Sequence, residues 1–107
     1  MEKEFKIIWA PRALKQADSA ITYCLKQFGK RTALRFVNKL EKDNIRIKNN
    51  PLIGAIEPAF VNKTKEYRSL VEGHYKIIYT LEKDNVIQVV LLWDCRKNPT
   101  KLKTSIR

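Results

Sequence analysis

The chain has 107 residues, 44% of them hydrophobic, so it suffices for one folded domain over residues 1–107 and is too short for two. Its net charge of +11 at pH 7 favours polyanionic partners, either nucleic acid or an acidic protein. No apolar stretch has the length of a membrane span and the opening residues lack the apolar segment of a signal peptide, so we expect a cytoplasmic protein without membrane contact.

The first part of the chain predicts a strand followed by a helix. Residues 4–9 alternate in part between apolar and polar side chains, which is typical of a short strand. Pro11 suits the first position of the helix that follows, and Gly29 can take the left-handed conformation that ends it. The side chains expected on the buried face of this helix are Leu14, Ala17, Ile21, Cys24, Leu25 and Phe28, with Cys24 as a reduced thiol.

A second helix follows almost without a loop, which predicts an antiparallel helical hairpin. This helix is expected to end before Pro51, because the residue that precedes a proline is kept out of the helical region. The residues that recur on its expected buried face are Ala33, Val37, Leu40 and Ile47. Residues 51–65, with Gly54 and Pro58, predict an ordered connector.

The remaining sequence predicts three strands joined by tight turns. The expected strands span residues 67–71, 75–81 and 86–93, and the last is nearly all apolar, as in a central strand covered on both faces. Asn98-Pro99 ends this strand and starts a short basic helix. We therefore expect an α+β fold with an N-terminal strand, an antiparallel two-helix hairpin, a three-stranded antiparallel meander that forms one sheet with the first strand, and a short C-terminal helix.

The positive charge is concentrated in two segments that contain no acidic residue. One lies between Asp18 and Glu41, and the other follows Asp94. Such segments indicate charged patches rather than a surface of alternating charges. The patches belong to the second predicted helix and to the C-terminal tail.

Several kinds of chemistry lack the residues that they need. The chain has one histidine, no glycine-rich phosphate loop and no spaced cluster of carboxylates, so we expect neither a metal nor another cofactor. His74 lies in a predicted turn and is expected to be solvated there. What remains is a basic and aromatic set: Lys63, Lys65, Arg68, Tyr75, Lys76, Tyr79 and Arg96.

A set of this kind can cleave RNA without a metal. Arginine and lysine stabilise the phosphorane that forms when the 2′-hydroxyl attacks, and a lysine whose pKa is lowered by neighbouring cations can accept the hydroxyl proton. The alternative interpretation is that these residues face solvent from the strands and have no catalytic role.

Several stretches in combination resemble the RelE/ParE family of toxins from type II toxin-antitoxin systems. They are residues 66–71 and 73–79, the ending 93–99, Trp9 with Arg12-Ala13, and Asn50-Pro51 with Gly54. The resemblance covers nearly the whole chain and implies a bacterial toxin held inactive by an antitoxin encoded beside it. RelE-like members cut mRNA on the ribosome with basic residues of the sheet, whereas ParE-like members inhibit DNA gyrase and need no nuclease site.

The resemblance also implies roles for individual residues. Arg96 matches the RelE-like arginine at the end of the last strand, Lys76 stands where that branch has arginine, and Arg68 is the basic residue nearest to its lysine pair. These three are the candidate catalytic residues, with Lys63 or Lys65 as candidate base. The residues expected to contact RNA or the antitoxin are Lys63, Lys65, Tyr75, Tyr79, Lys97, Lys101 and Lys103.

Strand register decides whether Arg68 and Lys76 can act on one phosphate. If Val71 pairs with Lys76, Arg68 lies on the opposite face of the sheet. If a bulge makes Glu72 pair with Lys76 instead, the two basic side chains share a face. A shift of one residue separates these cases, because side chains alternate between faces. The sequence is compatible with both.

The sequence thus leads to a toxin with two candidate mechanisms. One is ribosome-dependent cleavage of mRNA, with Arg68, Lys76 and Arg96 at the scissile phosphate. The other is non-enzymatic inhibition of DNA gyrase through the basic tail, residues 96–107. A family member that has lost toxicity and acts as a binding module is a third interpretation. Under both toxic mechanisms, mRNA cleavage and gyrase inhibition, we expect a hetero-oligomer with an acidic antitoxin. A partly disordered segment of the antitoxin would fold on the basic surface.

Overall fold

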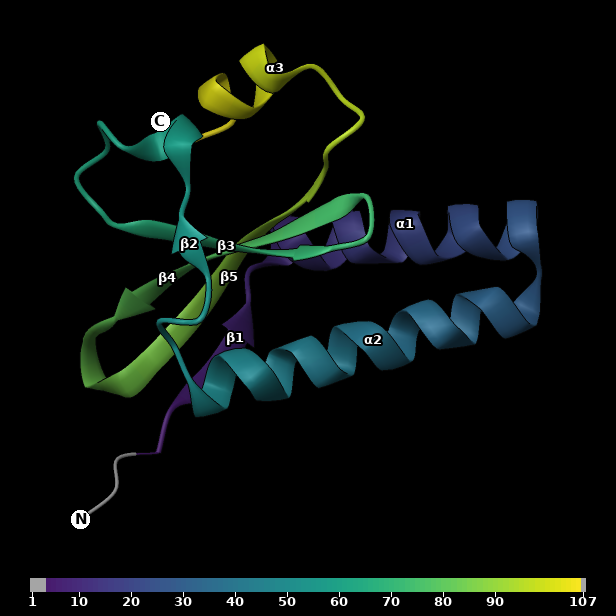
Figure 1. Cartoon of the computed structure of the whole chain (residues 1–107), viewed down its shortest axis with the longest axis horizontal. Helices are drawn as coiled ribbons and strands as arrows, with labels where there is room; N and C mark the ends of the chain where they lie inside the picture. The colour runs from purple at the N-terminus through teal and green to yellow at the C-terminus, as the bar shows by residue number, and fades with distance from the viewer. Residues whose placement is uncertain (1–3, 107) are drawn as a thin grey trace.

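Five strands form a single sheet in the computed structural model, which describes residues 4–106 (Figure 1). Their order in the sheet is β1-β5-β4-β3-β2, and their bounds are Lys6–Trp9 (β1), Ala55–Ile56 (β2), Tyr67–Glu72 (β3), Tyr75–Glu82 (β4) and Val86–Asp94 (β5). The first strand runs parallel to β5, and all other neighbours are antiparallel. The predicted α+β architecture is confirmed, and the apolar strand β5 is an interior strand between β1 and β4.

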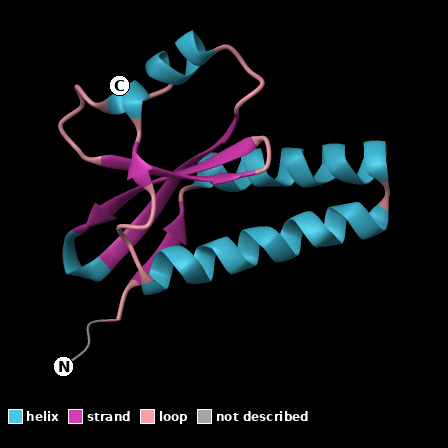
Figure 2. Cartoon of the chain, in the orientation of Figure 1, coloured by secondary structure: helices cyan, strands magenta, loops and turns pink. Residues whose placement is uncertain are grey.

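Two helices, α1 (Pro11–Phe28) and α2 (Lys30–Asn49), form the predicted antiparallel hairpin on one face of the sheet (Figure 2). A single residue, Gly29, joins them. Its φ of 90° lies in the left-handed region that favours glycine. The Gly29 N–H donates to the Leu25 carbonyl at 3.0 Å, and the Gly29 carbonyl accepts from the Ala33 N–H at 3.1 Å. Neither helix of the hairpin is long and apolar enough to cross a membrane.

The buried side of α1 differs from the prediction. Ala13, Ala17 and Ala20 are its buried residues, because small side chains let the helix approach the sheet closely. The distal half of the hairpin extends beyond the sheet, which therefore cannot cover the larger side chains there (Figure 1). Ala17 of the predicted stripe is buried as expected, whereas Leu25 and Phe28 lie in that distal half and are exposed. Leu14 lies near the start of α1 and is exposed because the helix turns Ala13 and Ala17 toward the sheet instead. On α2 the prediction is confirmed for Ala33, Leu40 and Ile47.

The second face of the sheet is covered by two short elements, η1 (Pro58–Phe60) and α3 (Pro99–Thr104). They close a second apolar core, which consists of Phe60, Tyr67, Ile78, Leu91, Trp93 and Leu102. The predicted start of the C-terminal helix is confirmed, because the Asn98 side chain caps it by accepting a hydrogen bond from the Thr100 N–H at 2.9 Å. The sheet thus lies between two layers.

The register of β3 and β4 separates Arg68 from Lys76. Val71 pairs with Lys76 and Arg68 pairs with Tyr79, so the first of the two registers that the sequence left open is the observed one. Because successive strand residues point to opposite faces, Arg68 lies on the hairpin side of the sheet and Lys76 on the other. A bulge does occur, but in the pairing of β4 with β5, next to Ile78.

The connector that precedes β3 passes very close to the sheet. A β-carbon at Gly54 would lie 2.7 Å from the Tyr79 hydroxyl oxygen and 2.9 Å from the Ser69 carbonyl oxygen. Only glycine therefore permits this approach. The next two residues form the edge strand β2, which the sequence did not predict because its pairing with β3 extends over only two residues.

Candidate functional site

Arg68, the first candidate catalytic residue, binds the connector. Its Nη1 donates to the Gly54 carbonyl at 2.8 Å, and its Nε donates to Glu66 Oε2 at 3.0 Å. Only 19% of its side chain is exposed. The guanidinium therefore holds the connector against β3, and its charge is already paired with a carboxylate.

Lys76, the second candidate, forms an ion pair with a carboxylate that the sequence analysis did not consider. Its Nζ lies 2.9 Å from Oε1 of Glu57, which is buried, and the other Glu57 oxygen accepts from the Ala59 N–H at 2.9 Å. Burial alone would raise the pKa of Glu57, but the hydrogen bonds from Ala59 and Lys76 outweigh it and hold this pKa below the ordinary value. Glu57 is therefore ionised at neutral pH and compensates the charge of Lys76.

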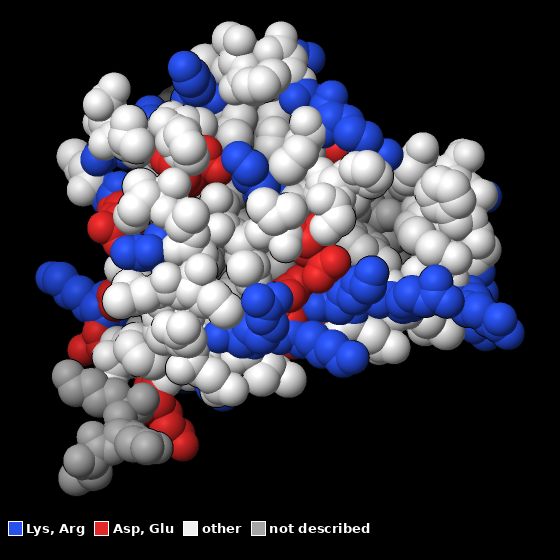
Figure 3. Space-filling view, viewed as in Figure 1, with Lys and Arg blue, Asp and Glu red and all other residues white. Residues whose placement is uncertain are grey.

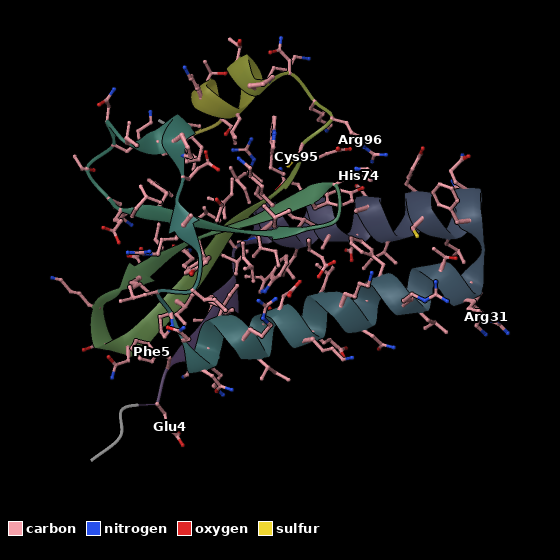
Figure 4. The ribbon with its side chains drawn as sticks, viewed as in Figure 1. Glu4, Phe5, Arg31, His74, Cys95 and Arg96 are labelled. Atoms are coloured by element: carbon pink, nitrogen blue, oxygen red, sulfur yellow. The ribbon has the colours of Figure 1, made fainter. Side chains whose placement is uncertain are left out.

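Arg96, the third candidate, lies beyond the end of β5 and on the hairpin side (Figure 4). Its Nε and Nη2 donate to the two carboxylate oxygens of Asp94, each at 2.9 Å. This bidentate pair lowers the pKa of Asp94. The guanidinium also lies 5.9 Å from the ring centroids of both Tyr23 and Tyr75, within the range of cation–π attraction.

The two predicted tyrosines have different surroundings. Tyr79 is fully buried, its hydroxyl donates to the Pro51 carbonyl at 2.7 Å, and the same oxygen accepts from the Gly54 N–H at 2.9 Å. It therefore has no surface on which a base or a partner could stack. Tyr75 is half-buried, with its ring centroid 5.4 Å from that of Phe36, and burial raises the pKa of its hydroxyl. Tyr75 lines the two cavities described below.

The predicted lysines fall into two groups. Near the connector, Lys63 Nζ donates to the Ile106 carbonyl at 2.8 Å, and Lys65 Nζ lies 3.1 Å from Glu82 Oε1. Both ammonium groups are thus engaged, one in fastening the C-terminus and the other in an ion pair. The lysines of the second group are exposed on the tail and on α3: Lys97, Lys101 and Lys103.

A cleft of about 580 Å³ opens between α1 and the end of β5. It brings together predicted and unpredicted residues, namely Arg12, Lys15, Tyr23, Tyr75, Arg96 and Lys97. A smaller cavity of about 260 Å³ adjoins it and shares Tyr23, Tyr75 and Arg96. The half-buried Cys24 lines this smaller cavity. The helical members were missed because their spacing on α1 matches that of any exposed helix face.

The lining of the cleft is suited to binding anionic and planar groups. Its cations suit carboxylates or phosphates, and its tyrosines suit apolar or planar groups. His74 is exposed in the turn, as predicted, and does not line the larger cavity. Within residues 4–106, no group of three or more histidine, cysteine, aspartate and glutamate side chains is arranged to hold a metal ion.

Two carboxyl groups meet where α2 approaches the end of β3. Asp43 is 2% exposed, its Oδ1 accepts from Arg46 Nη1 at 3.1 Å, and its Oδ2 is buried without a hydrogen-bond partner among the described residues. The pKa of Glu72 is raised, first by hydrogen bonding to Asp43 and then by burial and by repulsion from that carboxylate. The Asp43 carboxylate therefore favours the protonated form of Glu72, whose carboxyl O–H can donate to Asp43.

Comparison with known proteins agrees with the fold. The family model described as "ParE toxin of type II toxin-antitoxin system, parDE" matches residues 7–99. No curated protein sequence gives a match. Among solved structures, the chain is similar to one titled "Chromosomal ParDE TA system from P. aeruginosa", with a TM-score of 0.68 and 16% identity over 83% of this chain and 94% of that one. Since the family model spans most of the chain, the resemblance inferred from the sequence is confirmed. The chain belongs to the ParE toxin family and is the toxin of a type II toxin-antitoxin system.

Proposed function

We propose that this toxin arrests growth without cleaving RNA, by binding and inhibiting DNA gyrase. The observation that carries the proposal is the separation of the three candidate catalytic residues. Arg68 and Lys76 lie on opposite faces of the sheet, and Arg96 lies beyond the end of β5. Gyrase is the target that the resemblance to the ParE-like branch implies.

Cleavage of RNA needs several groups around one phosphate. A base must reach the 2′-hydroxyl, and cations must reach the phosphorane oxygens, each within hydrogen-bond distance. Two side chains on opposite faces of one sheet cannot meet these conditions together. Lys76 is also engaged elsewhere, because its Nζ forms an ion pair with Glu57 Oε1 at 2.9 Å.

The second partner we propose is an acidic antitoxin that forms a hetero-oligomer with the chain. Support comes from the cations that line the larger cleft and from the exposed lysines of the tail, Lys97, Lys101 and Lys103. A partly disordered acidic segment would gain order as it binds such a surface. Charge complementarity would also accelerate the encounter at low ionic strength.

The proposal is tested by two assays, one with the purified protein and one in cells. Purified chain is added in excess to gyrase and relaxed plasmid, and RNA ends are mapped in cells that express the chain. We expect supercoiling to stop, antitoxin to restore it, and no new RNA ends to appear. Arg96→Ala serves as the discriminating variant, because a RelE-like nuclease would lose its RNA ends with this change. Normal supercoiling refutes the proposal. If new RNA ends that depend on Arg96 then appear, the result favours mRNA cleavage. If supercoiling is normal and no new RNA ends appear, the result favours a binding module.

A further inference from the structure

Five basic side chains form a stripe along the exposed side of α2. The stripe consists of Arg31, Arg35, Lys39, Lys42 and Arg46, all of them exposed. Their spacing of four, four, three and four residues keeps them within an arc of about 80° on a helix with 3.6 residues per turn. With a rise of 1.5 Å per residue, the stripe is about 22 Å long. Figure 3 shows the corresponding row of basic side chains over α2.

Most of this charge is not compensated. Among the residues that the structure describes, only Arg46 has an ion-pair partner, the buried Asp43. The other four contrast with Arg68, Lys76 and Arg96, each of which lies within 3.0 Å of a carboxylate oxygen. The stripe is therefore a concentrated source of positive potential, and its side chains are free to bind anions.

We propose that this stripe binds the phosphate backbone of double-stranded DNA. A duplex presents one negative charge per about 1.7 Å of its axis, so a segment as long as the stripe offers about 13 phosphates to its cations. The other side of α2 packs on α1 and the sheet, with Ala33, Leu40 and Ile47 buried. The helix therefore lies along the backbone rather than entering a groove, and the contact carries no base sequence information.

The residue types in the stripe favour a duplex over single-stranded nucleic acid. Proteins that bind single strands stack the bases on aromatic side chains, and the stripe contains none. The choice of DNA over duplex RNA rests on the proposed function, because gyrase presents duplex DNA to whatever binds it. In that setting the stripe adds a DNA contact to the contacts that the toxin makes with the enzyme.

The experiment measures how salt changes the affinity of the purified chain for a 20-base-pair duplex, by fluorescence anisotropy between about 50 and 200 mM salt. The test variant is Arg31→Ala, Arg35→Ala, Lys39→Ala and Lys42→Ala together, which spares Arg46 and its buried partner. The matched control removes the same charge from four exposed lysines outside the stripe, the cleft and the tail: Lys6→Ala, Lys26→Ala, Lys48→Ala and Lys83→Ala. Circular dichroism establishes that each variant is folded. A fourth protein, with Arg31→Lys and Arg35→Lys, keeps the charge. The double variant Arg31→Ala and Arg35→Ala, which should lose about half as much slope, serves if the quadruple change unfolds the chain.

We expect the slope of log K against log salt to lose about 3 to 4 in magnitude in the stripe variant, since each phosphate contact contributes about 0.9. In the control variant the magnitude of this slope falls by less than about 1, and the charge-conserving variant keeps the native slope. Equal losses in the stripe and control variants would overturn the inference, because binding would then follow total charge. Tighter binding of single-stranded DNA or duplex RNA than of duplex DNA would also overturn it, as would a stripe variant that loses affinity for polyglutamate but not for DNA.

This titration contains no gyrase, so its outcome is separate from that of the supercoiling assay. Binding to DNA that depends on the stripe, together with normal supercoiling, refutes the gyrase proposal and leaves the DNA contact in place. Inhibited supercoiling, together with DNA binding that does not depend on the stripe, supports the gyrase proposal and refutes the DNA contact.

Discussion

Replacing Glu72 with glutamine is expected to stabilise the chain at neutral pH and to leave its stability nearly unchanged at acidic pH. The folded state raises the pKa of Glu72 above its ordinary value of 4.5, so proton sharing with Asp43 contributes stability below that value. This contribution is lost as the pH rises through the pKa of the folded state. In Glu72→Gln the side-chain amide can donate to the buried Oδ2 of Asp43 at every pH.

The magnitude follows from the surroundings of the pair. A buried acceptor without a partner costs about 1 to 3 kcal/mol, and a hydrogen bond to a charged group contributes a similar amount. Lys39 and Arg46 already lower the pKa of Glu72 by attraction, and Glu72 is only half-buried, so the lower end of the range applies. We therefore expect a gain of about 1 kcal/mol in the free energy of unfolding at pH 7.5, or about 4 °C in Tm.

Urea denaturation at pH 4 and pH 7.5 measures this difference. The matched control is Glu41→Gln, which removes a carboxylate from the exposed surface of α2, the helix that carries Asp43, and should change the free energy of unfolding by less than about 0.5 kcal/mol at either pH. An equal gain at both pH values would refute the role of the shared proton. A loss of stability at pH 7.5 would show that the carboxylate itself, and not its proton, holds the turn against α2.

Two further substitutions test the assignments in and beside the sheet. Glu57→Ala leaves the half-buried Lys76 without its partner and is expected to lower the free energy of unfolding by about 2 to 3 kcal/mol at pH 7. Because the pKa of Glu57 is lowered in the folded state, the contribution of the pair is present above the ordinary value of 4.5 and lost as the pH falls through the folded pKa, which urea denaturation at several pH values detects. Tyr79→Phe removes a donor to Pro51 and the acceptor of the Gly54 N–H, and should cost about 1 to 3 kcal/mol while leaving affinity for DNA and the antitoxin unchanged.

The sequence correctly predicted the elements whose position depends on local features, such as helical spacing and the residues at helix ends. Helical spacing and the proline and glycine at its ends located α1, and Asn98-Pro99 located α3. The sequence prediction was wrong where contacts with distant parts of the chain determine which side chains are buried. The face that α1 buries depends on how far the sheet reaches beneath the hairpin, and this reach is not encoded in the helix itself. Leu25 and Phe28 fit the helical period and are nevertheless exposed.

The candidate site was harder to predict than the fold, for a reason that Lys76 illustrates. Its partner Glu57 lies in the connector, which the sequence analysis treated only as a link between elements. Nothing in the spacing of these two residues indicates a contact, because the connector folds back over the second face of the sheet. The face on which Lys76 lies depended in turn on a register that both sequence and turn length left open.

The distribution of compensated charge bears on where this toxin acts. Basic residues of the sheet and its flanks are paired with acidic ones: Lys65 with Glu82, Arg68 with Glu66, Lys76 with Glu57 and Arg96 with Asp94. The net charge of +11 is therefore not spread evenly over the surface. The positive potential is weaker over the sheet and stronger over the helices than an even distribution would give. The sheet of a RelE-like nuclease must keep its cations free for a phosphate. Among the described residues of this chain, most of the cations outside such ion pairs lie on α2, around the cleft beside α1, and on the tail, where they can bind a polyanion.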